Sequence, residues 1–328
     1  MPANMMDIFV RNDQAIKESF KWENQLIRKF SAFQLALAGQ EVDRGQVKAM
    51  KEYIKQKTSA FSYFRSHNLF PIAVSLTSEE QPEHVFDQTV QYYEELKEAG
   101  FRRSMYLPYA AYFLASHVPQ DEVKLTVEKA LNCHQLMKQE HFWLTSDDDY
   151  MLAFILAYSH DDMEKAVHDS EECYDYLNRN GMGKGNTLQT IGYLLSLSKQ
   201  RAADKCDCLL WYIDELKQHK IKLDSYSRPL LALLATVEED RDEIVKGIIG
   251  TDKELASKDG FGRWSLGRAS RNMFSVALVL SQYLQNGSQA SISATIQNSI
   301  QSVLLAQQAA MVGAIAASTA ASSSSSSS

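Results

Sequence analysis

Apolar positions recur along most of the chain with the spacing of α-helices. Between about residues 65 and 285 a five-residue core repeats, consisting of a small residue, three mostly apolar residues and a second small residue. Small residues four positions apart lie on one face of a helix, and the apolar residues between them indicate burial on all sides. The pattern therefore predicts a series of closely packed inner helices. Their leading small residues are Ala73, Ala111, Ala153, Gly192, Ala232 and Ala277, at spacings of 38, 42, 39, 40 and 45.

A longer amphipathic segment, rich in charge, follows each of the first five inner segments. A hairpin of one inner and one outer helix cannot bury its own apolar face, so we expect it to stack on neighbouring hairpins. Only 6 prolines and 14 glycines interrupt the chain, and no strand pattern is evident. We therefore predict an all-α fold in which residues 61–287 form an α-solenoid-like array of about six helical hairpins, each of roughly 40 residues.

The two ends of the chain differ from this array. Amphipathic patterns over 13–37 and 43–57 predict two helices, which form an N-terminal helical cap within residues 1–60. Residues 288–317 carry no charge and predict a helix that closes the array or binds another protein. Its apolar run is shorter than the about 20 residues needed to cross a bilayer, so no transmembrane segment is predicted. The serine-rich tail, 318–328, is predicted to be disordered.

Charge is distributed unevenly. The chain has 34 basic and 41 acidic side chains, a net charge of −7, and residues 121–180 alone hold 5 basic and 14 acidic ones. A nucleic acid or an anionic membrane would be repelled by this middle region, so we expect no nucleic-acid partner. Four cysteines are too few for a disulfide framework, and the first residues lack the apolar core of a signal peptide. The predicted compartment is the cytoplasm.

Three carboxylates, Asp147 to Asp149, follow Ser146 at the start of an inner segment. Acidic side chains and a capping hydroxyl are favoured at this end of a helix, where backbone N–H groups lack partners. Consecutive helical residues point about 100° apart, so these carboxylates do not converge on one metal ion. We predict that they cap the helix.

Several stretches together resemble a known protein family. They are Phe61–Ser66 (FSYFRS), Gly100–Ala111 (GFRRSMYLPYAA), the region from Leu144 to Ala157 and the C-terminus rich in Ala and Gln. These stretches are similar to an uncharacterised bacterial family, domain of unknown function 4003 (DUF4003), and the resemblance covers nearly the whole chain. It implies a bacterial cytosolic protein, and it implies no activity, ligand or site residue.

A histidine pair is the first candidate for chemistry. His117 and His160 follow neighbouring inner segments at corresponding ends, and Asp161 and Asp162 follow the second histidine. Stacked helices lie roughly 8 to 10 Å apart, so the two imidazoles could share an ion, and His with Asp suits zinc or iron. Exposed loop histidines are the simpler interpretation. No metal site is therefore favoured, and no cofactor is predicted.

A glycine-rich loop with arginines is the second candidate. Arg263, Arg268 and Arg271 lie in or just after the loop 260–268, where guanidinium groups and backbone donors could hold an anion or a partner. No Lys-Ser/Thr follows as in a P-loop, and no strand precedes it as in a dinucleotide-binding fold. A structural turn is the simpler interpretation.

Two functional hypotheses follow. The first is a non-catalytic repeat protein that acts as a protein–protein interaction module, presenting the acidic middle section, with Glu164, Glu171 and Asp175 facing water, and the uncharged C-terminal helix. The second is an enzyme or a small-ligand-binding protein that uses a cleft of the array. The first is favoured because helical arrays form extended surfaces and no catalytic constellation emerges. The partner, any reaction and the oligomeric state stay open.

Overall fold

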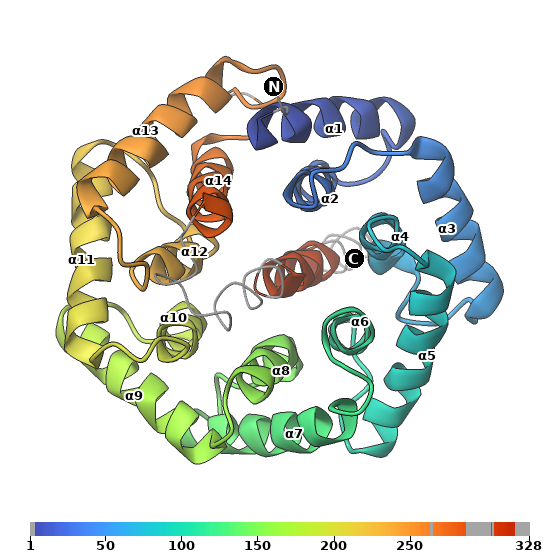
Figure 1. Ribbon diagram of the computed structural model, residues 1–328, viewed down its shortest axis with the longest axis horizontal. Helices are drawn as coiled ribbons and strands as arrows, with labels where there is room; N and C mark the ends of the chain where they lie inside the picture. The colour runs from blue at the N-terminus through green and yellow to red at the C-terminus, as the bar shows by residue number, and fades with distance from the viewer. Residues whose placement is uncertain (1–3, 263–264, 287–302, 304, 319–328) are drawn as a thin grey trace, which may run out of the picture. The chain divides into compact units, whose positions relative to one another are not determined.

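The chain forms two compact units, which are described separately. The computed structural model describes residues 4–262, 265–286, 303 and 305–318, and within them every regular element is a helix (Figure 1). The predicted all-α fold class is confirmed. Unit 1 comprises Met1–His134, Ser146–Ile155 and Gln301–Ser328, and unit 2 comprises Gln135–Thr145 and Leu156–Ile300.

Unit 1 contains long amphipathic helices that alternate with shorter apolar ones. It ends in a helix over residues 305–318, from the far end of the chain. The helices before it are α1 (Met5–Ser19), α2 (Gln25–Leu37), α3 (Arg44–Lys57), η1 (Ser66–Asn68), α4 (Leu69–Leu76), α5 (Pro82–Glu98), α6 (Leu107–His117), the first part of α7 (Val123–Glu140), η2 (Asp147–Asp149) and the first part of α8 (Tyr150–Ser159).

Successive helices of unit 1 pack in pairs, and each pair of helices with the loop that joins them is called a hairpin here. The helix pairs α1 and α2, α3 and α4, and α5 and α6 are in contact. Neighbouring hairpins contact each other through their corresponding helices. The apolar helix α2 contacts α4, and the amphipathic helix α3 contacts both α1 and α5. In these hairpins the amphipathic helix packs against the apolar helix that follows it.

Unit 2 repeats this alternation. The pairs α9 and α10, α11 and α12, and α13 and α14 are in contact, and so are α10 and α12, α12 and α14, α9 and α11, and α11 and α13. The bounds are α9 (Met163–Arg179), α10 (Asn186–Ser196), α11 (Ala202–Gln218), α12 (Ser227–Leu234), α13 (Arg241–Ser257) and α14 (Arg268–Asn286), beside the later parts of α7 and α8.

The small residues predicted to mark inner helices are buried. All six, Ala73, Ala111, Ala153, Gly192, Ala232 and Ala277, lie on the apolar helices α4, α6, α8, α10, α12 and α14. Gly192 shows why size matters in unit 2: a Cβ atom there would lie 2.8 Å from the backbone oxygen of Ser170 on α9. The absence of a side chain at this position lets α10 approach α9.

The prediction of one continuous helix over residues 13–37 is wrong. The structure contains two helices there, because α1 ends at Ser19 and α2 starts at Gln25. Asn24 caps the second helix, and its Oδ1 accepts hydrogen bonds from the backbone N–H groups of Leu26 and Ile27 at 2.8 and 3.4 Å.

An ion pair is buried inside the resulting α1–α2 hairpin. The ammonium of Lys29 donates to the carboxylate of Asp13, and the two side chains are only 1% and 6% exposed. Burial lowers the pKa of Lys29, while the charge of Asp13 opposes this change. Each charge thus has its counter-ion inside the hairpin.

The uncharged C-terminal helix belongs to the core of unit 1. Val303, Leu305, Met311 and Val312 are at most 2% exposed, and Nε2 of Gln308 donates to the Ser31 hydroxyl at 3.4 Å. A chain segment without charges can be buried in this way without desolvating an ion. Of the predicted C-terminal features, residues 287–302 and 319–328, including the serine-rich tail, lie outside the described residues. Among the described helices, none combines the length and apolar character that crossing a membrane requires.

Candidate functional site

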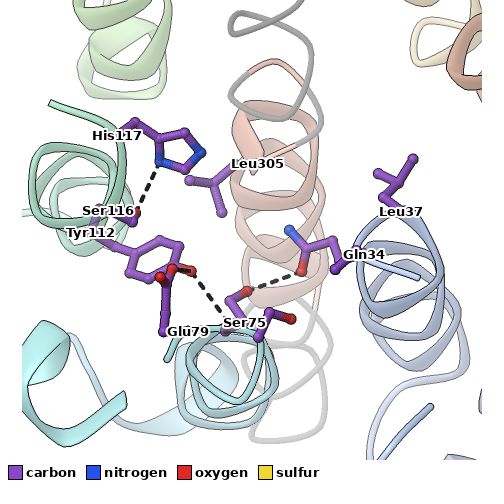
Figure 2. A pocket seen from close by; sticks show the side chains of 10 residues that line it. Gln34, Leu37, Ser75, Glu79, Tyr112, Ser116, His117 and Leu305 are labelled. Atoms are coloured by element: carbon purple, nitrogen blue, oxygen red, sulfur yellow. Dashed lines mark hydrogen bonds between the residues drawn. The ribbon is translucent and has the colours of Figure 1, made fainter. Parts of the chain in front are cut away.

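A polar pocket lies in unit 1 at the ends of α4 and α6. It is bounded by α2 on one side and by the helix 305–318 on another (Figure 2). Its volume is about 240 Å³, which limits an occupant to a small molecule. The lining residues are Gln34, Leu37, Ala38, Ser75, Ser78, Glu79, Tyr112, Ser116, His117 and Leu305.

Glu79 and Tyr112 form a hydrogen-bonded pair in the lining of the pocket. The Tyr112 hydroxyl donates to Oε1 of Glu79 at 2.7 Å, and it also lies 3.3 Å from the backbone oxygen of Ser75. Burial raises the pKa of Glu79, and the hydrogen bond from Tyr112 opposes part of that rise. Burial and the nearby carboxylate raise the pKa of Tyr112 well above its ordinary value, so this hydroxyl stays protonated and acts as a donor.

Ser116 and His117 form a second polar pair at the end of α6. The Ser116 hydroxyl donates to the backbone oxygen of Tyr112 at 2.6 Å and lies 2.9 Å from Nδ1 of His117. Which of the two atoms donates in this contact depends on the tautomer of the His117 ring. The imidazole also stacks on Phe113, with ring centroids 5.4 Å apart and an interplanar angle of 17°.

The remaining walls are partly polar and partly apolar. Ser75 donates to Oε1 of Gln34 at 3.0 Å, and this bond links α4 to α2 across the pocket. Leu37, Ala38 and Leu305 supply apolar surface. The pocket thus combines a few converging polar groups with an apolar wall, as small-ligand sites commonly do.

The predicted histidine pair is divided between the units. His117 lies in the pocket of unit 1 and His160 lies in unit 2, where burial lowers its pKa. Asp161 and Asp162 are exposed, and Asp162 caps α9 by accepting from the Lys165 N–H at 3.0 Å. A shared metal site stays a prediction. Within the described residues, no group of three or more His, Cys, Asp or Glu side chains is arranged to hold a metal.

The arginines of the glycine-rich loop have separate surroundings. Arg263 lies outside the described residues, and Arg268 is exposed at the start of α14. Arg271 is buried, and its guanidinium contacts both carboxylate oxygens of Asp252 at 2.7 and 3.2 Å. Its charge is therefore balanced inside unit 2.

The predicted acidic surface on α9 is only partly exposed. Glu164 and Asp175 face water as expected. The prediction was wrong for Glu171, whose side chain is 20% exposed and lies 2.9 Å from Nε2 of His141. Burial raises the pKa of Glu171, and the neighbouring His141 opposes this change.

Most residues of the pocket were not predicted from the sequence, although the repeated core contains a signal. Ser75 stands where the other five segments carry an apolar residue, and Tyr112 places a hydroxyl next to Ala111. A polar group at such a buried position needs a partner, so these departures from the pattern point to a polar site. Nothing in the sequence pattern pointed to Gln34 or Leu305.

Comparison with known proteins gives a family match over most of the chain. The family model described as "Protein of unknown function (DUF4003)" matches residues 12–309. The chain is also 26% identical over 303 residues to "Uncharacterized protein YeaA" of Bacillus subtilis (strain 168), covering 89% of this chain and 88% of that protein. No solved structure gives a significant match.

Proposed function

Because the chain belongs to the DUF4003 family, a family of unknown function, we propose a function from its own geometry: unit 1 binds a small polar molecule in the pocket between α2, α4, α6 and the helix 305–318. One observation carries this proposal. Polar side chains from α2, α6 and the segment that ends α4 converge on one cavity of about 240 Å³.

The chemistry of the lining supports binding. Placing a carboxyl and a hydroxyl in a half-buried site disfavours the folded state unless each has a partner. Glu79 and Tyr112 satisfy one another in part, and a bound molecule would supply further hydrogen bonds. The apolar wall, which includes Leu305, excludes water from one side and would strengthen those bonds.

The proposal includes the hairpin arrangement that presents the site. The contacts between successive helices, and between like helices of neighbouring hairpins, support a repeated helical-hairpin array within each unit. Stacked hairpins bring the ends of α4 and α6 to a common edge, where residues distant in sequence meet. The cytoplasm remains the proposed compartment, since all four cysteines are free thiols.

A protein-binding role is the second candidate. In unit 2, Phe142 and Trp143 are adjacent and are 60% and 92% exposed, and Glu164 and Asp175 on α9 are exposed as well. Exposed aromatic side chains are common in protein interfaces, and surrounding charges influence the rate of association. In this second candidate function the chain binds another protein, and no nucleic-acid partner is proposed.

Blocking the pocket tests the first proposal. Ser78→Phe and Ala38→Phe place a large side chain in the pocket from the turns that follow α4 and α2, and Ser257→Phe on the exposed end of α13 serves as the control. Ligand-observed NMR with a collection of polar fragments should give binders that both pocket variants lose and the control retains. Binders that persist in both pocket variants, or no binders at all, would contradict the proposal.

A further inference from the structure

We infer that the ligand of this pocket carries a protonated amine, which binds against the carboxylate of Glu79. The inference rests on the proposed function and specifies the class of ligand. It is drawn from three other carboxylates with little exposure that lie beside a basic side chain, and from Glu79, beside which the described pocket lining offers no lysine or arginine.

Three other carboxylates with little exposure lie beside a basic side chain of their own unit. Asp13 contacts Lys29, Asp252 contacts Arg271, and Glu171 contacts His141. A buried charge is tolerated when a counter-ion accompanies it. This chain thus meets that requirement with its own residues at three sites, whereas the buried Asp149 accepts from the backbone N–H of Ser146.

The surroundings of Glu79 differ from those of these three carboxylates. Its hydrogen-bond partner is the neutral Tyr112 hydroxyl. Among the described residues that line the pocket none is a lysine or an arginine, and the histidine there, His117, contacts Ser116 through Nδ1. Tyr112 binds Oε1, so the other carboxylate oxygen, Oε2, remains for a further donor. A cation that arrives with the ligand would complete the pairing that the protein supplies elsewhere.

An ammonium group suits the other lining groups as well. It offers three donors and no acceptor, and the pocket presents acceptor oxygens on Glu79, Gln34 and Ser75. An anionic ligand would instead be repelled by Glu79. A metal ion is a poorer fit because Glu79 is the only carboxylate among the described lining residues.

The apolar wall limits the rest of the ligand. Leu37, Ala38 and Leu305 also line the pocket, and they suit a short alkyl chain. The ligand class is therefore a small primary amine with a chain of a few carbon atoms, not a large aromatic or polyanionic compound.

Three matched probes distinguish charge from size. 4-Aminobutan-1-ol is a cation, butane-1,4-diol is neutral and 4-hydroxybutanoate is an anion, and all three have chains of the same length. Calorimetric or NMR titration at about pH 8, where the amine is still protonated, should show that the amine binds about tenfold tighter than the diol or more, and that the anion binds most weakly.

A neighbouring glutamate provides the matched control. Glu79→Gln should weaken binding of the amine by about tenfold and leave the diol nearly unaffected, because a neutral amide keeps the shape but not the charge. Glu80→Gln makes the same change at the exposed adjacent residue and should alter neither. Glu79→Asp, which keeps the charge on a shorter side chain, should lie between the wild type and Glu79→Gln.

The outcomes separate the inference from the proposed function. Equal or tighter binding of the diol or the anion, lost in the two pocket-blocking variants, would overturn the amine inference and leave a small-molecule pocket. Unchanged amine binding in Glu79→Gln would also overturn it. If none of the three probes binds, the inference fails, and if no polar fragment binds either, the proposed function fails with it.

Discussion

The α1–α2 hairpin and the pocket of unit 1 both bury a carboxyl group, and they neutralise it differently. In the hairpin, Asp13 meets the ammonium of Lys29, and both side chains are almost fully buried. In the pocket, Glu79 meets a tyrosine hydroxyl beside a cavity of about 240 Å³. Asp13 thus has a counter-ion within the hairpin, whereas none of the described residues that line the pocket is a lysine or an arginine. This difference separates a structural ion pair from a binding site, and it can be tested by removing each partner in turn.

The largest expected effect is the loss of the hairpin's counter-ion. Lys29→Met leaves Asp13 buried without its cation, so the free energy of unfolding should fall by about 3 to 5 kcal/mol. Chemical denaturation measures this change. Lys48→Met, at an exposed position of α3, should change stability by about 0.5 kcal/mol or less. Equal changes in the free energy of unfolding for Lys29→Met and Lys48→Met would contradict a stabilising role for the buried ion pair.

A third carboxyl sharpens the comparison because its partner is a backbone amide. Asp149 is 5% exposed, and its Oδ2 accepts from the Ser146 N–H at 3.0 Å. Burial, with a smaller effect of the nearby Asp148 carboxylate, raises the pKa of Asp149 to about 7. The folded state therefore keeps a proton that the unfolded chain loses near pH 4, and stability should fall between about pH 4 and pH 7.

Asp149→Asn tests this pH dependence. The asparagine oxygen can still accept from Ser146 but does not titrate, so the variant should lack roughly 3 kcal/mol of the decline in unfolding free energy across that pH range. Denaturation at a series of pH values measures it. Parallel stability profiles for the wild type and the variant would mean that Asp149 titrates normally.

The smallest expected effect belongs to the pocket. Glu79→Gln removes a half-buried charge and keeps a group that Tyr112 can donate to, so stability at neutral pH should rise by about 1 kcal/mol or less. The direction is opposite to that of Lys29→Met. A loss of several kcal/mol in thermal or chemical denaturation would mean that Glu79 has a structural role like that of Asp13.

Helical periodicity was sufficient to predict the inner helices. The six leading small residues from Ala73 to Ala277 are buried because a small residue among apolar ones has a purely local signature. The break between α1 and α2 was missed, since Phe20 and Trp22 continue the apolar pattern through the turn although Trp22 is 90% exposed. Local pattern shows that a residue is apolar and does not show what covers it.

The pocket lay beyond local pattern for the same reason. Gln34, Glu79 and Leu305 are far apart in sequence, and they meet because α2 contacts α4 and the helix 305–318 packs within unit 1. The hydrogen bond between Ser31 and Gln308 spans 277 positions. An uncharged helix indicates burial, but the periodicity does not specify its partner, and so the sequence left closure of the array and binding of another protein as alternatives.

The central claim is that the Glu79 carboxylate binds a cation that the ligand supplies. Titration of the Glu79 carboxyl group tests this claim most directly. The carboxyl signal can be followed by ¹³C NMR in protein labelled at glutamate Cδ and assigned by its loss in Glu79→Gln. The titratable groups lining the pocket with it are Tyr112 and His117, both on α6. The account predicts that the free protein shows a Glu79 pKa above the ordinary value, which saturating 4-aminobutan-1-ol lowers and butane-1,4-diol does not. A Glu79 pKa in the ordinary range that the amine leaves in place would contradict it.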